Sequence, residues 1–212
     1  MPRWQGKRVA VMYGGQSTER DVSLRTGKAC ADALVSKGYD VLLVDVDREV
    51  AARLREAKVD VAFNALHGRW GEDGCVQGLL EAMGIPYTGS GVLASAMGMD
   101  KVVAKAMFKA LGLAVIDYRV FPAARAASIA PADLPFGIPC VVKPSGEGSS
   151  VGVHKVRSRA HLVSAIKDAS RYDHDVLVEP FVDAREVECA VLGGFDPRAS
   201  VLGEIRFASE FY

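Results

Sequence analysis

The sequence predicts an α/β protein with two differently built parts. From residue 8 to residue 88, short apolar runs typical of buried strands alternate with segments of helical periodicity. This β-α-β-α-β order predicts a parallel sheet with helices on both faces. From residue 115 onward, strand-like runs follow one another across loops with a single helical segment between them, which predicts an α+β unit with mainly antiparallel pairing.

The first part divides into strands and helices that end at glycines or polar turns. Strands are expected at residues 8–13, 41–46 and 59–64, with a short strand-like segment at 85–88, and helices at 20–37, 49–57 and 74–83. Parallel sheets bind ligands beyond the carboxyl ends of their strands. Gly14-Gly15 and His67-Gly68 follow such ends, so both loops are expected to face one crevice.

The second part begins after a hinge-like break at residues 89–91. Helices are expected at 92–97 and 101–111, with Asp100 as the N-cap of the second, because its carboxylate can accept from free backbone N–H groups. The Ala- and Pro-rich stretch 122–135 is expected to be a surface connection. Further strands are expected at 115–121, 138–142, 153–156, 176–178, 186–192 and 200–207, with a helix at 159–171.

Composition narrows the function classes. Lys plus Arg equals Asp plus Glu at 26 each, which argues against nucleic-acid and membrane-surface partners. The four cysteines, at positions 30, 75, 140 and 189, form no C-x-x-C pair, so zinc and thioredoxin-like sites are not indicated. Three of the four lie in apolar-patterned segments, which predicts reduced, buried thiols of a cytosolic protein. The apolar run at 9–12 is too short for a signal peptide core or a membrane span.

The stretch Lys143-Pro-Ser-Gly-Glu-Gly-Ser-Ser-Val-Gly152 lies between two strand-like runs. Its glycines let the backbone approach a ligand closely, and its N–H groups and hydroxyls can surround anionic oxygens. Lys143 adds a positive charge suited to phosphate. The alternative is an ordinary mobile hairpin, and these ten residues alone leave both interpretations open.

Polar residues at the loops of the predicted sheet are candidates for ligand contacts. Glu19 can belong to a capping box at the start of a helix, or its carboxylate can point into the crevice and take an ammonium group. His67 is hard to explain as a core residue and is a candidate carboxylate binder or proton handler. Near it, Asp73 can cap the next helix and Arg69 can be solvated. Lys101 opens a helix, where the dipole favours anions, so a ligand role is favoured over a solvated one.

Two further patterns concern nucleotide recognition. Gly89-Ser-Gly-Val-Leu-Ala94 resembles a dinucleotide fingerprint, but no acidic residue follows about 20 positions later, so this function is not indicated. The strand 176–178 leads into Glu179-Pro180, where Glu179 can accept from an exocyclic amine and the backbone of Phe181 and Val182 can line an adenine. An edge strand ending at a proline explains the same residues.

Taken together, these motifs resemble the D-alanine–D-alanine ligases of the ATP-grasp superfamily over essentially the whole chain. The resemblance is carried by the order and spacing of residues 14–19, 66–74, 84–91, 99–101, 142–144, 147–152 and the acids at 179 and 186. It implies a pre-ATP-grasp substrate-binding domain at 1–93, a central ATP-grasp subdomain at 94–180 and the start of a second subdomain at 181–212.

The resemblance also implies a role for each candidate residue. Lys101 and Lys143 would hold ATP phosphates, and the loop residues Glu147, Gly148, Ser149, Ser150 and Val151 would close over them. Adenine and ribose would meet Glu179, Pro180, Phe181, Val182 and Glu186. The ammonium of the first D-alanine would be positioned by Glu19 with Ser149, its carboxylate would meet His67, and Glu72 would support the site.

The reaction implied is ATP-dependent amide formation through an acyl phosphate, with Mg²⁺ or Mn²⁺, in a cytoplasmic homodimer that supplies peptidoglycan precursors. Gly146 departs from the arginine of many family members. The family's metal ligands and second-substrate site are expected beyond Tyr212, so the 212 residues alone are expected to bind nucleotide weakly and not to catalyse. Three alternatives remain: a ligase using D-lactate or D-serine, a non-catalytic binding module, and another ATP-grasp carboxylate ligase.

Overall fold

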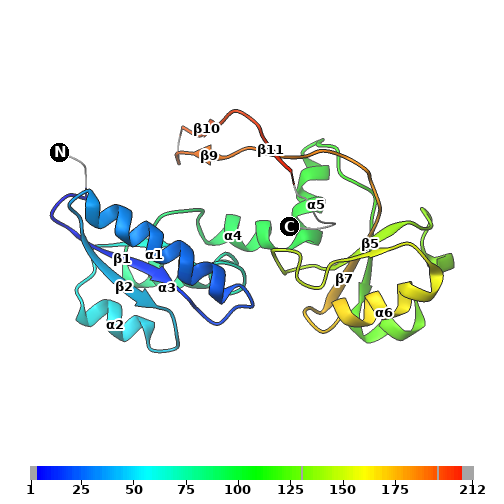
Figure 1. Cartoon of the computed structure of the whole chain (residues 1–212), viewed down its shortest axis with the longest axis horizontal. Coiled ribbons are helices and arrows are strands. Elements are labelled where there is room, and N and C mark those ends of the chain that lie inside the picture. Colours follow the sequence, from blue (N-terminus) through cyan, green and yellow to red (C-terminus); the bar gives the residue numbers. More distant parts are fainter. Residues whose placement is uncertain (1–3, 130, 195, 207–212) are drawn as a thin grey trace.

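The computed structural model describes residues 4–129, 131–194 and 196–206 (Figure 1). Its first part is a three-stranded parallel sheet of order β2-β1-β3, with β1 (Arg8–Tyr13) between β2 (Asp40–Asp45) and β3 (Val61–Asn64). We call the part built on this sheet the N-terminal lobe.

Helices cover both faces of the parallel sheet, as the strand and helix order predicts. On one face, Val11 packs with Ala31 of α1 (Arg20–Ser36). On the other face, Ala10 and Met12 pack against α2 (Val50–Glu56) and α3 (Cys75–Met83). The alternation of buried side chains along β1 therefore divides the lobe into two small cores.

The segment 85–88 does not form the expected strand. It makes one parallel bridge, Ala62↔Tyr87, held by Ala62 N–H to Pro86 O at 2.8 Å and Thr88 N–H to Ala62 O at 3.1 Å. Pro86 has no N–H to give a ladder, so the pairing stops after one bridge.

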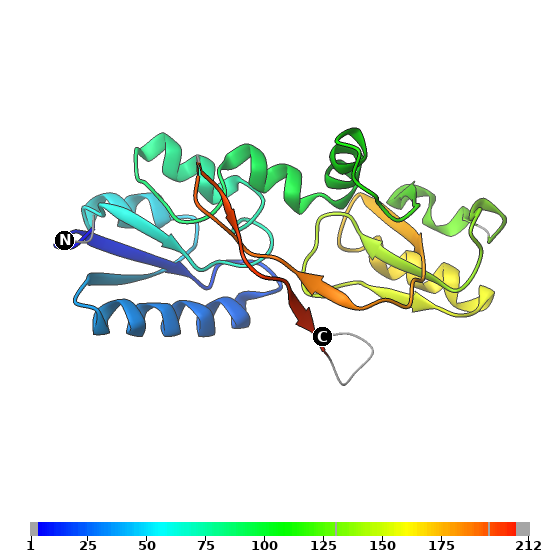
Figure 2. The same cartoon turned by 90° about the horizontal axis from the view of Figure 1, so that it is seen from above.

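Two helices, α4 (Val92–Met99) and α5 (Lys101–Ala110), connect the lobes (Figure 2). Asp100 is the N-cap of α5, as expected: its Oδ1 accepts from Val102 N–H at 2.8 Å and from Val103 N–H at 3.1 Å.

The second sheet is antiparallel, with order β4-β7-β5-β6, and we call the part built on it the central lobe. Its strands are β4 (Arg119–Pro122), β5 (Cys140–Pro144), β6 (His154–Val156) and β7 (Asp175–Pro180). One face packs on α6 (Arg159–Ala169) through a buried aliphatic cluster. Because β7 lies inside the sheet, the edge-strand explanation of residues 176–180 is wrong.

The stretch 122–135 is more than a surface connection. It forms two 3₁₀ turns, η1 (Ala123–Ser128) and η2 (Pro131–Asp133), and it buries Ile129 and Leu134 in the core under α6. Each of these apolar residues directly follows one of the turns, and their burial in the core outweighs the loop-like composition of the stretch. The strand expected at 115–121 is shorter, because pairing with β7 starts at Arg119.

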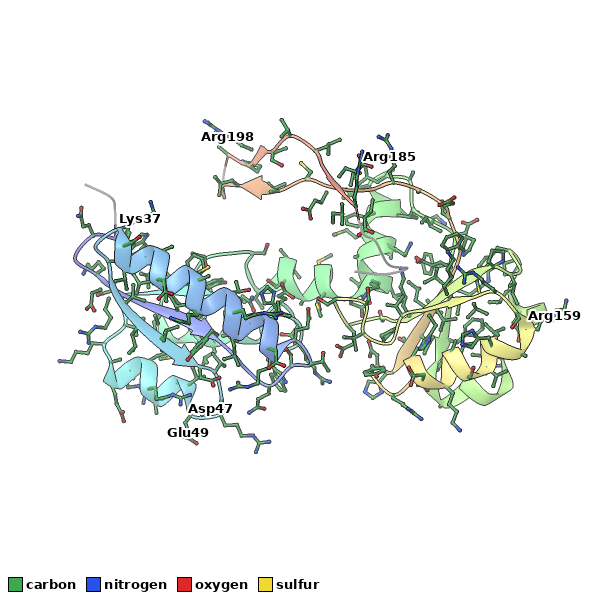
Figure 3. All side chains as sticks on the ribbon, viewed as in Figure 1. Lys37, Asp47, Glu49, Arg159, Arg185 and Arg198 are labelled. Carbon is green, nitrogen blue, oxygen red and sulfur yellow. The ribbon has the colours of Figure 1, made fainter. Side chains whose placement is uncertain are left out.

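A thin ribbon follows β7 and runs back over the connecting helices (Figures 1 and 2). Its strands are β8 (Glu186–Glu188), β9 (Val191–Leu192), β10 (Arg198–Ala199) and β11 (Gly203–Ile205), with antiparallel pairs β9-β10 and β8-β11. The expected hairpin is therefore present but interrupted; residue 207 lies outside the described residues. Arg185 and Arg198 project from this ribbon (Figure 3), as do exposed apolar side chains such as Leu192.

All four cysteines are free, and they differ in burial. Cys140 is buried in β5 and Cys30 is half-buried, but Cys75 and Cys189 are exposed, so the expectation of three buried thiols is wrong. Cys75 is the first residue of α3, and Cys189 lies between two short ribbon strands. No helix among the described residues is both long enough and apolar enough to span a bilayer.

Candidate functional site

The candidate residues gather where the two lobes meet. Four segments converge there: the turn after β1, the loop after β3, the start of α5, and the glycine-rich loop between β5 and β6. Thr18 Oγ1 lies 3.4 Å from Glu147 Oε2, and the hydroxyl of Ser149 donates a short hydrogen bond to Glu19 Oε1. Residues about 130 positions apart thus form one polar seam.

Glu19 is the buried carboxylate of this seam. It is the N-cap residue of α1 but makes no side-chain cap bond, and 6% of its surface is exposed. The capping-box interpretation is therefore wrong, since the carboxylate turns away from its helix toward Ser149. Glu19 Oε2 has no hydrogen-bond partner among the described residues. A buried carboxylate oxygen in this state is a strong acceptor for a cationic donor.

Two glycines make room for the Glu19 carboxylate. A Cβ on Gly68 would stand 2.4 Å from Glu19 Oε2, and one on Gly148 would stand 3.0 Å from the same atom. Gly68 also has φ +65°, a conformation that L-residues adopt at a cost. Glycine at both positions lets the backbone of both lobes approach the unpaired oxygen closely.

An arginine clamp fixes the turn that presents Glu19. The Arg20 guanidinium contacts both oxygens of Asp45, at 2.7 and 2.5 Å, and donates to Gly15 O at 2.8 Å. The hydrogen bond from Arg20 lowers the pKa of Asp45 from its ordinary value. Burial acts in the opposite direction, and the hydrogen bond from the Gly15 N–H lowers the pKa further. The clamp joins the ends of β1 and β2 directly before Glu19.

His67 lies beside Gly68 and is held from two sides. Its Nε2 is 3.1 Å from Thr26 Oγ1, and its Nδ1 is 3.8 Å from Glu72 Oε1. Glu72 also accepts from Gly68 N–H at 2.7 Å, so it supports the loop that carries His67. Asp73 accepts from Cys75 N–H at 3.1 Å, which agrees with its interpretation as a cap for α3.

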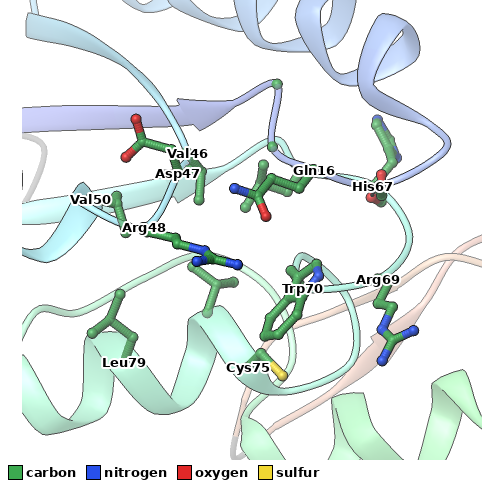
Figure 4. A pocket seen from close by; sticks show the side chains of 15 residues that line it. Gln16, Val46, Asp47, Arg48, Val50, His67, Arg69, Trp70, Cys75 and Leu79 are labelled. Carbon is green, nitrogen blue, oxygen red and sulfur yellow. Dashed lines mark hydrogen bonds between the residues drawn. The ribbon is translucent and has the colours of Figure 1, made fainter.

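The crevice expected at the ends of β1 and β3 is present. Gly14, Gly15 and His67 line one cavity of about 330 Å³, together with side chains from the start of α2 and from α3. Figure 4 shows Gln16, Arg48 and Trp70 around it. His67 and Glu72 also line a second cavity of about 620 Å³ on the side of Thr26.

The glycine-rich loop is held in a tight conformation. Ser149 and Ser150 have φ of 45° and 61°, and Val151 N–H bonds Gly148 O at 3.0 Å. Gly146 N–H donates to Asp173 Oδ2 at 2.6 Å. Burial raises the pKa of Glu147, and the nearby Asp173 and Glu19 carboxylates raise it further against the effect of Thr18. Neighbouring carboxylates therefore repel one another at this loop, which also lies next to Lys101 and Lys143.

Lys101 reaches into this loop from the start of α5. Its ammonium donates to Ser145 O at 3.2 Å and, through a short contact, to Glu147 O. Burial lowers the pKa of Lys101, and the charge of Lys143 is the next largest cause. The solvated-surface interpretation of Lys101 is therefore wrong, and the two lysines lie close enough to repel each other. An anion between them would relieve that repulsion.

Lys143 and Glu179 project from the same face of the central sheet, opposite α6, because Val141 pairs with Glu179 and Lys143 lies two residues further along β5. Their ion pair spans 2.5 Å between Nζ and Oε2. The second oxygen, Oε1, lies 2.5 Å from Lys105 Nζ without the alignment of a hydrogen bond. Glu179 is 4% exposed.

The remaining candidates follow β7. Phe181 lies under the ammonium of Lys155, 3.4 Å from the ring centroid, and its N–H bonds Pro139 O at 3.0 Å. Pro180 ends β7, and Val182 is half exposed. Glu186 is in the ribbon, where its strand pairs with β11, and it makes no described side-chain contact with the other candidates.

Three residues of this site were missed by sequence reasoning. Lys105 lies four positions after Lys101, on the same side of α5, and that spacing was a usable signal. Asp173 and Asp45 reach the site from loop and strand ends distant in sequence, and no local pattern marks them. Among the described residues no group of three or more His, Cys, Asp or Glu side chains is arranged to hold a metal ion.

Comparisons with known proteins show the family of the chain. Residues 8–57 and 50–90 match the family model described as D-ala D-ala ligase N-terminus, and residues 107–212 match the one described as D-ala D-ala ligase C-terminus. The chain is 68% identical, over its whole length, to the D-alanine–D-alanine ligase of Anaeromyxobacter sp. (strain Fw109-5) and covers 68% of that protein.

More distant relatives give the same result. Identity to the D-alanine–D-alanine ligase of Geobacter sulfurreducens is 53%, over 97% of this chain and 63% of that protein. The solved structure of the D-alanine–D-alanine ligase from Coxiella burnetii has a TM-score of 0.80 at 30% identity, covering 95% of this chain and 69% of that one. The chain thus spans about two thirds of the length of these relatives.

Proposed function

The chain belongs to the D-alanine–D-alanine ligase family, and we propose that its seam binds the first D-alanine and the triphosphate of ATP. The activity is the ATP-dependent joining of two D-alanine molecules into D-alanyl-D-alanine, a peptidoglycan precursor. The observation that carries the proposal for this chain is the buried Glu19 carboxylate, one oxygen of which has no hydrogen-bond partner among the described residues and is closely approached by two glycines.

The first D-alanine is oriented by charge at both ends. Its ammonium pairs with Glu19, whose other oxygen is already held by Ser149. Its carboxylate lies toward His67, which Thr26 and Glu72 hold in place from opposite sides of the ring. Fixing both ends of a small zwitterion places its carboxylate for attack.

The chemistry proceeds in two steps. A carboxylate oxygen of the first D-alanine attacks the γ-phosphorus of ATP, which forms an acyl phosphate and releases ADP. The amine of the second D-alanine then attacks the acyl carbon, the amide C–N bond forms, and inorganic phosphate leaves with the electron pair of the broken C–O bond. The amine loses one proton in this step.

Phosphoryl transfer needs positioning and charge neutralisation more than covalent help from the protein. Lys101 and Lys143 supply two positive charges near the glycine-rich loop, where Glu147, Gly148, Ser149, Ser150 and Val151 cover the phosphates. The loop excludes water from the acyl phosphate, which would otherwise hydrolyse. Glu179, Pro180, Phe181, Val182 and Glu186 take the adenosine, and Glu72 supports the D-alanine site.

Family resemblance supports four finer proposals. ATP binds together with Mg²⁺ or Mn²⁺, for which the described residues gather no ligand set, so no step above is assigned to the metal. The protein acts as a homodimer, and it acts in the cytoplasm. Residues 1–93 form the substrate-binding domain, 94–180 the central ATP-grasp subdomain, and 181–212 the start of a further one. Sedimentation of the purified protein tests the dimer.

The D-alanine site is tested in a chimera. Residues 1–212 replace the matched part of the Anaeromyxobacter sp. (strain Fw109-5) relative, and ADP release is followed with D-alanine, D-lactate, D-serine and L-alanine. We expect D-alanine turnover. In Glu19→Gln, kcat/KM for D-alanine should fall about 100-fold, while the KM for ATP stays within about twofold, because a buried charge pair is lost.

The matched control for this variant is Glu49→Gln. Glu49 is also an N-cap glutamate without a side-chain cap bond, at the start of α2, but it is exposed. Glu49→Gln should leave the kcat/KM for D-alanine and the KM for ATP unchanged. Equal losses in the two variants would refute the assignment of Glu19 to the substrate ammonium. Turnover of L-alanine instead of D-alanine would refute the proposed substrate.

A further inference from the structure

The buried carboxylate of Glu179 lies between two lysines from different elements. Lys143 comes from β5 and Lys105 from α5, and each ammonium nitrogen is 2.5 Å from one carboxylate oxygen. The exposed fraction of the side chains is 6% for Glu179, 15% for Lys105 and 21% for Lys143. Three charged groups are thus held together with little access to water.

One lysine is enough to balance one carboxylate, and the second adds an uncompensated positive charge in a poorly hydrated place. Removing two charges from water is costly, and a third is harder to justify by stability alone. The surplus charge is explained if the group is built to receive an anion. Lys101 adds a further positive charge near Lys143, which the carboxylates of Glu147, Asp173 and Asp100 offset in part.

The two lysines differ in how firmly they are held. Lys105 also donates to Ile116 O at 3.2 Å, and its ammonium lies 5.3 Å from the centre of the Tyr118 ring. These contacts anchor it to the segment that leads into β4. Lys143 lies on the side of Lys101, whose charge repels it, so moving toward an anion lowers the energy of both.

We propose that Lys105 is a positioning residue for adenine recognition, and that Lys143 exchanges the Glu179 carboxylate for a phosphate of the nucleotide when ATP binds. The inference rests on the proposed function. In the nucleotide-free chain Glu179 holds Lys143. When ATP arrives, Lys143 turns to the phosphates and Lys105 alone compensates the charge of Glu179.

The exchange has a consequence for selectivity. Once Lys143 has left, Glu179 Oε2 is free to accept a hydrogen bond from the exocyclic amine of adenine, while Lys105 keeps the carboxylate in place. A buried acceptor built for an amine rejects a base that presents a carbonyl oxygen there, because two acceptors would then face each other. Phosphate binding and base selection are therefore coupled through one carboxylate.

The first test measures nucleotide selectivity. The 212-residue chain, labelled with ¹⁵N, is titrated with ATP and with inosine triphosphate (ITP), whose base carries a carbonyl oxygen in place of the amine, and NMR shifts give both dissociation constants even when binding is weak. We expect the chain to prefer ATP by roughly tenfold or more. Lys105→Met should reduce this preference to about threefold or less, mainly by weakening ATP binding. Lys105→Arg should restore it, because it keeps the charge.

Lys109→Met is the matched control, since Lys109 is exposed one turn later on the same helix. It should keep the preference for ATP. An unchanged preference in Lys105→Met overturns the role of Lys105 while leaving the nucleotide site intact. Absence of ATP-dependent shifts in the unmodified chain overturns both this role and the nucleotide site of the proposed function.

The second test needs no base and does not depend on how Lys105→Met folds. Inorganic tripolyphosphate is titrated into the chain and into Glu179→Gln. If Glu179 competes with phosphate for Lys143, the variant should bind tripolyphosphate about three- to tenfold more tightly, because no ion pair has to be broken first. Equal or weaker binding by Glu179→Gln overturns the exchange.

Discussion

Replacing Gly68 by alanine should affect the Glu19 carboxylate more than the fold. Gly68 has φ +65°, and a Cβ there would stand 2.4 Å from Glu19 Oε2. Alanine in the left-handed region costs about 1 kcal/mol. The overlap itself is relieved when the carboxylate turns away, but that movement breaks the hydrogen bond from Ser149, and a hydrogen bond to a charged group contributes roughly 1.5–3 kcal/mol.

Gly84 provides a matched control for the backbone strain. Its φ is +67°, and no atom lies within 4 Å of the position that a Cβ would take. Gly84→Ala should therefore lose only the strain, about 1 kcal/mol. Gly68→Ala should lose about 2.5–4 kcal/mol in urea unfolding, the sum of strain and the broken bond. The difference between the two variants isolates the contact with Glu19.

D-alanine binding separates the functional effect from the stability effect. NMR titration of the 212-residue chain with D-alanine should give a dissociation constant at least about tenfold higher for Gly68→Ala, because a displaced carboxylate no longer meets the ammonium. Gly84→Ala should bind D-alanine as the unmodified chain does. The reasoning is refuted if both variants lose the same stability and D-alanine affinity is unchanged in Gly68→Ala.

Three further predictions concern packing and charge. A Cβ on Gly27 would stand 2.3 Å from the Cβ of Tyr13. Gly27→Ala should therefore lower the free energy of unfolding by about 1–3 kcal/mol, although alanine has the higher helix propensity. A variant that is more stable in urea unfolding would contradict this. The Arg20 hydrogen bond lowers the pKa of Asp45, so this half-exposed pair stabilises the protein above about pH 4 and loses its effect as pH falls through the lowered pKa. Asp45→Asn should therefore be less stable by about 1 kcal/mol or less at neutral pH, and this difference in the free energy of unfolding should disappear on acidification. A difference that stays constant with pH would contradict a role of the pair. Burial and the charge of Lys143 lower the pKa of Lys101, and bound phosphates should raise it again, so ATP binding at about pH 9 should take up protons. Calorimetry in two buffers of different ionisation enthalpy detects this uptake. Identical binding enthalpies in the two buffers would rule out the proton uptake.

Most of the fold could be predicted because it depends on local patterns. The alternating apolar runs around β1, the glycine stops and the Asp100 cap are properties of neighbouring residues, and the structure confirms them. One error has a long-range cause: Ile129 and Leu134 lie in a loop-like stretch and are buried against α6. The other has a local cause, because Pro86 limits the pairing of the strand expected at 85–88.

The site was predictable in its residue types but less so in its contacts. The spacing of glycines and charges marked the segments that meet at the seam, whereas the partner of each side chain depends on how the lobes meet. Ser149 with Glu19 and Lys105 with Glu179 join residues 130 and 74 positions apart. No periodicity within a strand or a helix contains that information.

The contact between Glu19 and Ser149 joins two lobes whose buried clusters share no residue. A small molecule bound to that carboxylate contacts both lobes at once, so part of its binding free energy stabilises the interface between the two lobes. Heating the chain with saturating D-alanine should therefore draw the melting of both lobes together into one sharper transition, whereas a ligand held by one lobe would shift the melting of that lobe alone.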